Sequence, residues 1–164
     1  MTLATVLALV ALACVVAAAG FDLWRFEIPD TLSVVLIGTA IGYGLLTPGF
    51  GWLSHIAATL LFFAVGLGLF ALGWMGGGDI KLMTGIAAWT GLWGLVFQLL
   101  ATSIAGGLMT LLILAVRAGV ARAGIAEARV PKVFHADAPI PYAVPIAIGT
   151  CWWAWLVWRS WPLG

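Results

Sequence analysis

Two aspartates stand at the ends of apolar segments, in positions from which they could act together on a peptide bond. Asp22 directly follows the apolar run 2–21, and Asp79 follows three glycines and precedes another apolar run. Peptide hydrolysis by two carboxyl groups needs one ionised group that takes a proton from water and one protonated group that donates to the scissile carbonyl. Close carboxylates oppose each other's ionisation, so such a pair shares a proton. This chemistry requires a fold that brings Asp22 and Asp79 together.

The elements that must position these acids are expected to be transmembrane helices. The chain has 164 residues, of which 64% are hydrophobic and 8% charged, and its mean hydropathy is +1.17. A soluble domain carries roughly 25% charged residues, so most of this surface is expected to face membrane lipids. The length allows one domain, residues 1–164, and the net charge of +1 gives no electrostatic reason to expect nucleic acid binding.

Apolar stretches between the few charges predict an all-α membrane bundle of about six transmembrane helices. The stretches 31–74 and 80–116 are each too long for one crossing of a hydrocarbon core of roughly 30 Å. A turn signal at residues 47–51 divides the first stretch, and residues 90–94 are the expected break in the second. The expected spans are 2–21, 31–46, 52–73, two within 80–116, and 142–158.

Basic residues predict the orientation of this bundle. Among the expected loops, those after the first, third and fifth spans contain nearly all the positive charges: Arg25, Lys81, Arg117, Arg122, Arg129 and Lys132. The opposite side has only Arg159. The positive-inside rule therefore places those three loops in the cytoplasm and both termini outside. Because two spans separate Asp22 from Asp79, both acids are expected at the cytoplasmic face.

Each polar feature also has a purely structural explanation. Asp79 and Asp30 both precede expected helices, and Asp is a favoured N-cap residue. The glycines before Asp79 could let a substrate backbone approach closely, or could be ordinary loop residues. Lys81 could orient a carboxylate or contact substrate, or it could fix the topology by snorkelling. His135 and Asp137 share a loop without a third ligand, so no metal site is expected.

Three segments resemble the type IV prepilin peptidases, a family of GxGD aspartyl proteases. Gly76, Gly77, Gly78 and Asp79 begin the sequence GGGDIKL, which is similar to the family's GGGDxKL motif. The segment 22–30 resembles the family's aspartate followed by a basic residue and Ile-Pro-Asn. Near the end, the segment 140–147, which contains Pro141 and Tyr142, resembles the family's Pro-Tyr segment that opens the last span.

The resemblance implies a membrane aspartyl endopeptidase without a cofactor, in which Asp22 and Asp79 form the catalytic pair. Its substrates would be prepilins and pseudopilins, whose short leader is removed at the cytoplasmic face of the bacterial inner membrane. The glycines, Lys81, Pro141 and Tyr142 would shape the site. The short chain is most similar to the peptidase-only branch that serves Flp-type (Tad) pili. Asp30 stands where Asn is usual, but Asp22 matches the family's catalytic position.

The alternative is a non-enzymatic membrane component of a pilus or secretion assembly, either a scaffold or a transporter. A transporter is expected to place polar groups at mid-membrane depth. Apart from apolar residues, the mid-span segments here hold only Ser, Thr, glycines and Gln98, while the acids lie at span ends. This distribution favours chemistry on a peptide at the membrane surface. A sister specificity within the same fold, as in archaeal preflagellin peptidases, is a further possibility.

Overall fold

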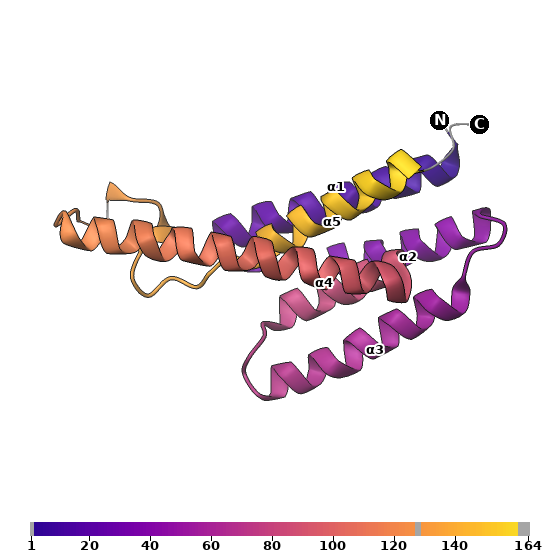
Figure 1. Ribbon diagram of the computed structural model, residues 1–164, viewed down its shortest axis with the longest axis horizontal. Coiled ribbons are helices and arrows are strands. Elements are labelled where there is room, and N and C mark those ends of the chain that lie inside the picture. Colours follow the sequence, from indigo (N-terminus) through magenta and orange to yellow (C-terminus); the bar gives the residue numbers. More distant parts are fainter. Residues whose placement is uncertain (1, 127–128, 161–164) are drawn as a thin grey trace.

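The computed structural model describes residues 2–126 and 129–160, and the described chain is a bundle of helices without strands (Figure 1). This confirms the prediction of an all-α fold. The elements are α1 (Leu3–Arg25), α2 (Asp30–Leu46), α3 (Trp52–Ala71), α4 (Gly77–Arg122), the short 3-10 helix η2 (Lys132–Phe134), and α5 (Ala143–Ser160). Helix α4 packs against α2, α3 and α5, and α1 packs against α2 and α5.

The composition of the helices suits a membrane protein. Helices α1, α3 and α4 are long and apolar enough to cross a bilayer, and α2 and α5 are shorter apolar helices. Large apolar side chains are exposed on the outside of the bundle, including Leu53, Leu60 and Leu111. Such a surface suits contact with apolar lipid chains. The helices also satisfy their own backbone hydrogen bonds, as lipid requires. The protein is therefore membrane-embedded, whereas the count of six crossings and the orientation of the termini stay predictions.

Helix α4 consists of two helical parts, 77–90 and 92–122, because the chain turns back at Gly91 (Figure 1). Gly91 has φ 65° and ψ −176°, a backbone conformation that glycine adopts at little cost. A Cβ at this position would also lie 2.9 Å from Oγ of Ser54. The expected break within residues 90–94 is thus confirmed.

Two residues of α3 bind the backbone groups that the turn at Gly91 separates. In a continuous helix, the N–H of Leu92 would donate to the carbonyl of Ala88. Here the N–H of Leu92 donates to Oγ of Ser54 at 3.0 Å, and Nδ1 of His55 lies 2.9 Å from the Ala88 oxygen. Buried or lipid-facing backbone groups need such partners. His55 therefore helps to build the turn.

The two ends of the bundle differ in the elements that they contain. One end, here called the turn end, contains Gly91, the α2–α3 connection, the start of α1 and the end of α5 (Figure 1). The other end, here called the aspartate end, contains the end of α1 and the starts of α2, α4 and α5. The second part of α4 extends well beyond the other helices on this side (Figure 1).

The extended part of α4 is tied to the chain that follows it by Arg117. The Arg117 guanidinium donates to the carbonyl oxygens of Val133, Ala136 and Ala138, at distances between 2.7 and 3.3 Å. The donors of Arg117 therefore organise the connection between α4 and α5.

Candidate active site

Asp22 lies in the last turn of α1 and is held by the first residue of α5. Its side chain is only 8% exposed, and its Oδ2 accepts a hydrogen bond of 2.8 Å from the backbone N–H of Ala143. The first N–H groups of a helix have no acceptor within the helix. Asp22 therefore caps α5 from a different helix. The positive end of the α5 dipole also favours a carboxylate at this point.

Asp22 is still helical, and the chain reverses direction only after the last turn of α1. Phe26 adopts a left-handed conformation with φ 55°, and its N–H donates to the carbonyl of Asp22 at 2.9 Å. Pro29 then precedes α2 directly. Helix α1 is longer than the expected span, which ended at residue 21. Asp22 is consequently a helical residue and not part of a polar loop.

Asp79 lies in the first turn of α4 and faces the same end of the bundle as Asp22. Asp79 is the third residue of α4 and is not its N-cap, since Gly76 occupies that position. This corrects the structural explanation that the sequence offered for Asp79. The two acids are close enough for the charge of Asp22 to act on Asp79. The expectation from span parity, that both acids lie at the same end, agrees with this arrangement.

The three glycines of the motif lie at the start of α4 and are closely packed. Gly76 is the N-cap, whereas Gly77 and Gly78 are helical, so the expected glycine loop is largely part of the helix. A Cβ on Gly78 would lie 3.2 Å from Cβ of Ile28, and a Cβ on Gly77 would lie 3.4 Å from the Phe70 ring. The glycines thus allow the α1–α2 connection and the end of α3 to approach the helix that carries Asp79.

Asp30 and Lys81 form an ion pair beside the two acids. Nζ of Lys81 lies 2.7 Å from Oδ2 of Asp30. Asp30 begins α2, but its side chain makes no capping hydrogen bond, and Pro29 is the N-cap. The expected capping role of Asp30 is therefore wrong. The pairing with Lys81 thus engages the third acid of this region.

Pro141 and Tyr142 lead into α5 and differ in their surroundings. Pro141 is fully buried, as is the adjacent Ala143 that binds Asp22. Tyr142 is 39% exposed, and a Cβ on Gly106 of α4 would lie 3.0 Å from its hydroxyl oxygen. Tyr142 therefore packs on the second part of α4, whereas Pro141 lies in the interior. The sequence did not point to Ala143, because a backbone N–H donor carries no signal in residue type.

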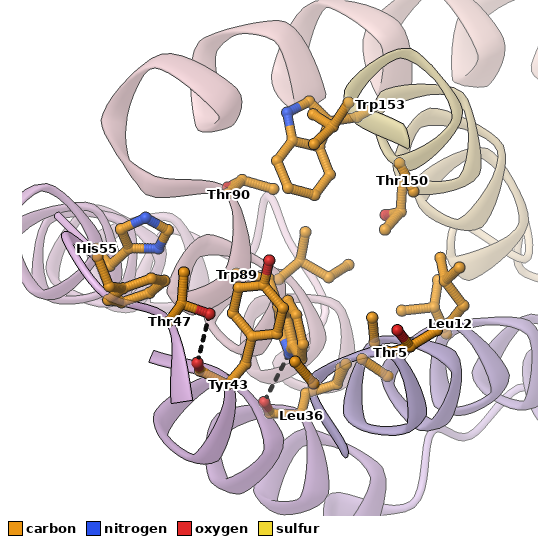
Figure 2. A pocket seen from close by; sticks show the side chains of 18 of the residues that line it. Thr5, Leu12, Leu36, Tyr43, Thr47, His55, Trp89, Thr90, Thr150 and Trp153 are labelled. Atoms are coloured by element: carbon orange, nitrogen blue, oxygen red, sulfur yellow. Dashed lines mark hydrogen bonds between the residues drawn. The ribbon is translucent and has the colours of Figure 1, made fainter. Parts of the chain in front are cut away.

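A cavity of about 670 Å³ lies toward the turn end and is separate from the two acids. Figure 2 shows side chains of α1, α2, α3, α4 and α5 around it, including Thr5, Leu36, His55, Trp89 and Thr150. Its lining includes the first half of α1 up to Val15 and neither Asp22 nor Asp79. Within the part of the chain that the structure describes, no three His, Cys, Asp or Glu side chains gather as a possible metal-ligand set.

Comparison with known proteins identifies the family. The model of the type IV leader peptidase family matches residues 9–111, which are more than half of the chain and include Asp22, Asp79 and the glycine motif. The Pro-Tyr segment before α5 lies outside the matched region. No curated protein and no solved structure gives a significant match. The resemblance seen in the sequence is confirmed, and the chain belongs to the type IV leader peptidase family.

Proposed function

We propose that this protein is an aspartyl endopeptidase that removes the short leader peptide of prepilins and pseudopilins, with Asp22 and Asp79 as its catalytic pair. The observation that carries the proposal is that α1 and α4 place Asp22 and Asp79 at the same end of the bundle, where Asp22 is held by the N-terminus of α5. Membership of the leader peptidase family supplies the peptidase class. Within this family, we propose prepilins of the Flp type as the substrates, as the resemblance of the sequence implies.

The two acids take different roles in this mechanism. Asp22 accepts the Ala143 N–H, and such a hydrogen bond favours the ionised form of a carboxyl group. Asp22 is therefore the base, and the proton that the pair shares lies on Asp79. Asp22 takes a proton from water, and the resulting hydroxide attacks the scissile carbonyl carbon. Asp79 donates its proton to the carbonyl oxygen as the tetrahedral intermediate forms.

Breakdown of the intermediate restores the pair. The carbonyl re-forms as the C–N bond breaks, and the leaving amine takes the proton that Asp22 removed from water. Asp79 recovers its own proton from the hydroxyl group of the intermediate. Water supplies one hydroxyl group and one hydrogen to the products, so no cofactor is needed. The partly exposed start of α4 gives the substrate access to Asp79, and the buried Pro141 keeps the donor of Ala143 in place.

The site faces the cytoplasm in this proposal. Arg25 and Lys81 lie at the aspartate end, and Arg117 follows on the extended part of α4. This charge distribution supports a multi-pass protein of a bacterial inner membrane with the aspartate end inside. The six helical segments, counting both parts of α4, would then each cross the membrane once. The chain 1–164 would form one peptidase domain, with both termini outside.

The test is cleavage of an Flp-type prepilin co-expressed with the wild type, Asp22→Asn or Asp79→Asn. Asn retains size and hydrogen bonding but cannot exchange a proton. Each substitution should lower the cleavage rate by on the order of a thousandfold or more, because members of a catalytic pair act as a unit. Asp137→Asn, which removes an exposed acid outside the site, should cut normally. A well-expressed wild type that cuts none of several prepilins would instead support the scaffold interpretation.

A further inference from the structure

The segment 22–30 is attached at both of its ends to elements of the candidate site. At its first residue, Asp22 binds the N–H of Ala143 in α5. At its last residue, Asp30 binds Nζ of Lys81 in α4. Between them, Ile28 packs against Gly78, one residue before Asp79 in the chain. The segment therefore links the starts of α4 and α5, and it contains one member of the proposed catalytic pair.

The geometry of the ion pair suits a tether between α2 and α4. Asp30 is the first residue of α2, and Lys81 lies two residues after Asp79. Two residues along an α-helix correspond to a rotation of about 200°, so Lys81 points away from the side of α4 that carries Asp79. Lys81 can thus hold the neighbouring helix without occupying the space between the two acids.

We propose that the Lys81–Asp30 ion pair is a positioning element of this site, which holds the α1–α2 connection (residues 26–29) against the start of α4 and so keeps Asp22 in register with Asp79. This inference rests on the proposed function, because the register matters only if the two acids act together. Neither residue touches the reacting atoms. Their effect passes through Ile28 on Gly78 and through the backbone that joins Asp30 to Asp22.

Exposure of the pair limits the size of the expected effect. Lys81 and Asp30 are 50% and 67% exposed, and water and salt weaken ion pairs at such positions. We therefore expect removal of the pair to lower kcat by about two- to fivefold. KM should change less, because the substrate-contacting groups remain in place. High salt should lower the kcat of the wild type and have less effect on variants that lack the pair.

A double-mutant cycle on the full-length protein in detergent tests the coupling between the two residues. The variants are Asp30→Asn, Lys81→Gln and the double variant, with Arg122→Gln and Asp137→Asn as exposed controls outside the pair. If the pair acts as a unit, the double variant loses no more kcat than either single variant, and Lys81→Arg retains most of the activity. Losses that multiply in the double variant would overturn the proposal.

Tryptic cleavage after Arg25 gives a readout that does not depend on peptidase activity. Arg25 is exposed and directly precedes the α1–α2 connection. Loss of the tether should raise the rate of cleavage at this bond by about two- to fivefold, and the two controls should leave it unchanged. Equal rates of tryptic cleavage in the wild type and the pair variants would overturn the proposal of a tether. A wild type that fails to cut prepilins would contradict the proposed function, while the tryptic rates still decide the tether.

Discussion

The turn end and the aspartate end of the bundle both rely on contacts between helices, but they use polar groups in opposite ways. At the turn end, Ser54 and His55 bind the two backbone groups that Gly91 separates. At the aspartate end, Asp22 accepts one N–H through a single oxygen, and among the described residues no hydrogen bond to the carboxyl group of Asp79 is present. The first arrangement is complete within the protein, whereas the second retains capacity to bind water and a peptide.

This difference separates polar residues that build the fold from those that are available for chemistry. The backbone groups that the turn at Gly91 separates need new partners, so Ser54 and His55 contribute to stability. A buried carboxyl group that remains partly unpartnered costs stability. We therefore expect substitutions at the aspartate end to change activity more than stability, and substitutions at the turn end to do the reverse.

Ala143→Pro should give the largest effect in this comparison, apart from loss of either aspartate. Proline lacks the N–H that Asp22 accepts, yet it is well tolerated at the first position of a helix. Loss of one hydrogen bond to a charged group corresponds to about 1.5–3 kcal/mol, so kcat should fall roughly tenfold to a hundredfold. Cleavage of a synthetic prepilin peptide measures the loss, and circular dichroism verifies that the helices remain.

The matched control for this substitution is Ala143→Gly, which keeps the N–H. It should retain most of the activity. In Ala143→Pro, activity should also require a higher pH, because the ionised form of the base has lost a donor. Equal losses in the proline and glycine variants, with an unchanged pH profile, would show that the N–H of Ala143 has no part in the reaction.

Gly91→Ala should lower stability and leave catalysis unchanged in the molecules that remain folded. Alanine is strained at φ 65°, and its Cβ would lie 2.9 Å from Oγ of Ser54. The expected cost is about 1–3 kcal/mol. Thermal inactivation in detergent measures it, and Gly107→Ala is the control, since Gly107 is helical and a Cβ there meets no atom within 4 Å. A normal thermal profile with reduced kcat would contradict the division between the two ends.

Ser54→Ala should give the smallest effect, because it removes one hydroxyl group at the turn. The N–H of Leu92 would lose its acceptor at an exposed position, which costs about 0.5–1.5 kcal/mol. Ser103→Ala is the control, since the Ser103 hydroxyl binds only a carbonyl of its own helix. A shift in thermal inactivation no larger than that of the control would show that water replaces Ser54 at the turn.

The features that the sequence predicted well are those carried by residue type and spacing. The glycines and Asp79 indicated the motif, and the number of spans between Asp22 and Asp79 placed both acids at one end. A break was predicted from length, because one helix across 80–116 would exceed the membrane thickness, and residues 90–94 were its expected position. The turn at Gly91 provides this break, because glycine can adopt the left-handed conformation that the turn needs.

The features that the sequence did not predict are contacts between distant elements. Asp30 and Lys81 are 51 positions apart, and only packing of α2 on α4 brings them together. The residues around Asp30 and Asp79 suggested that each aspartate is an N-cap. In the structure the N-caps are Pro29 and Gly76, which adopt the extended conformation that precedes each helix. The donor at Ala143 is a backbone group, which any residue except proline would provide.

The hydrogen bond between Asp22 and Ala143 determines when the candidate site becomes complete during synthesis. Asp22 belongs to the first helix and its donor to α5, so ribosomal synthesis produces both aspartates long before it produces the N–H of Ala143. A nascent chain that has inserted α1 to α4 would carry the pair in an unfinished state. Full activity would then arise only when α5 enters the membrane, which would protect pilin precursors in the same membrane from incomplete copies of the enzyme.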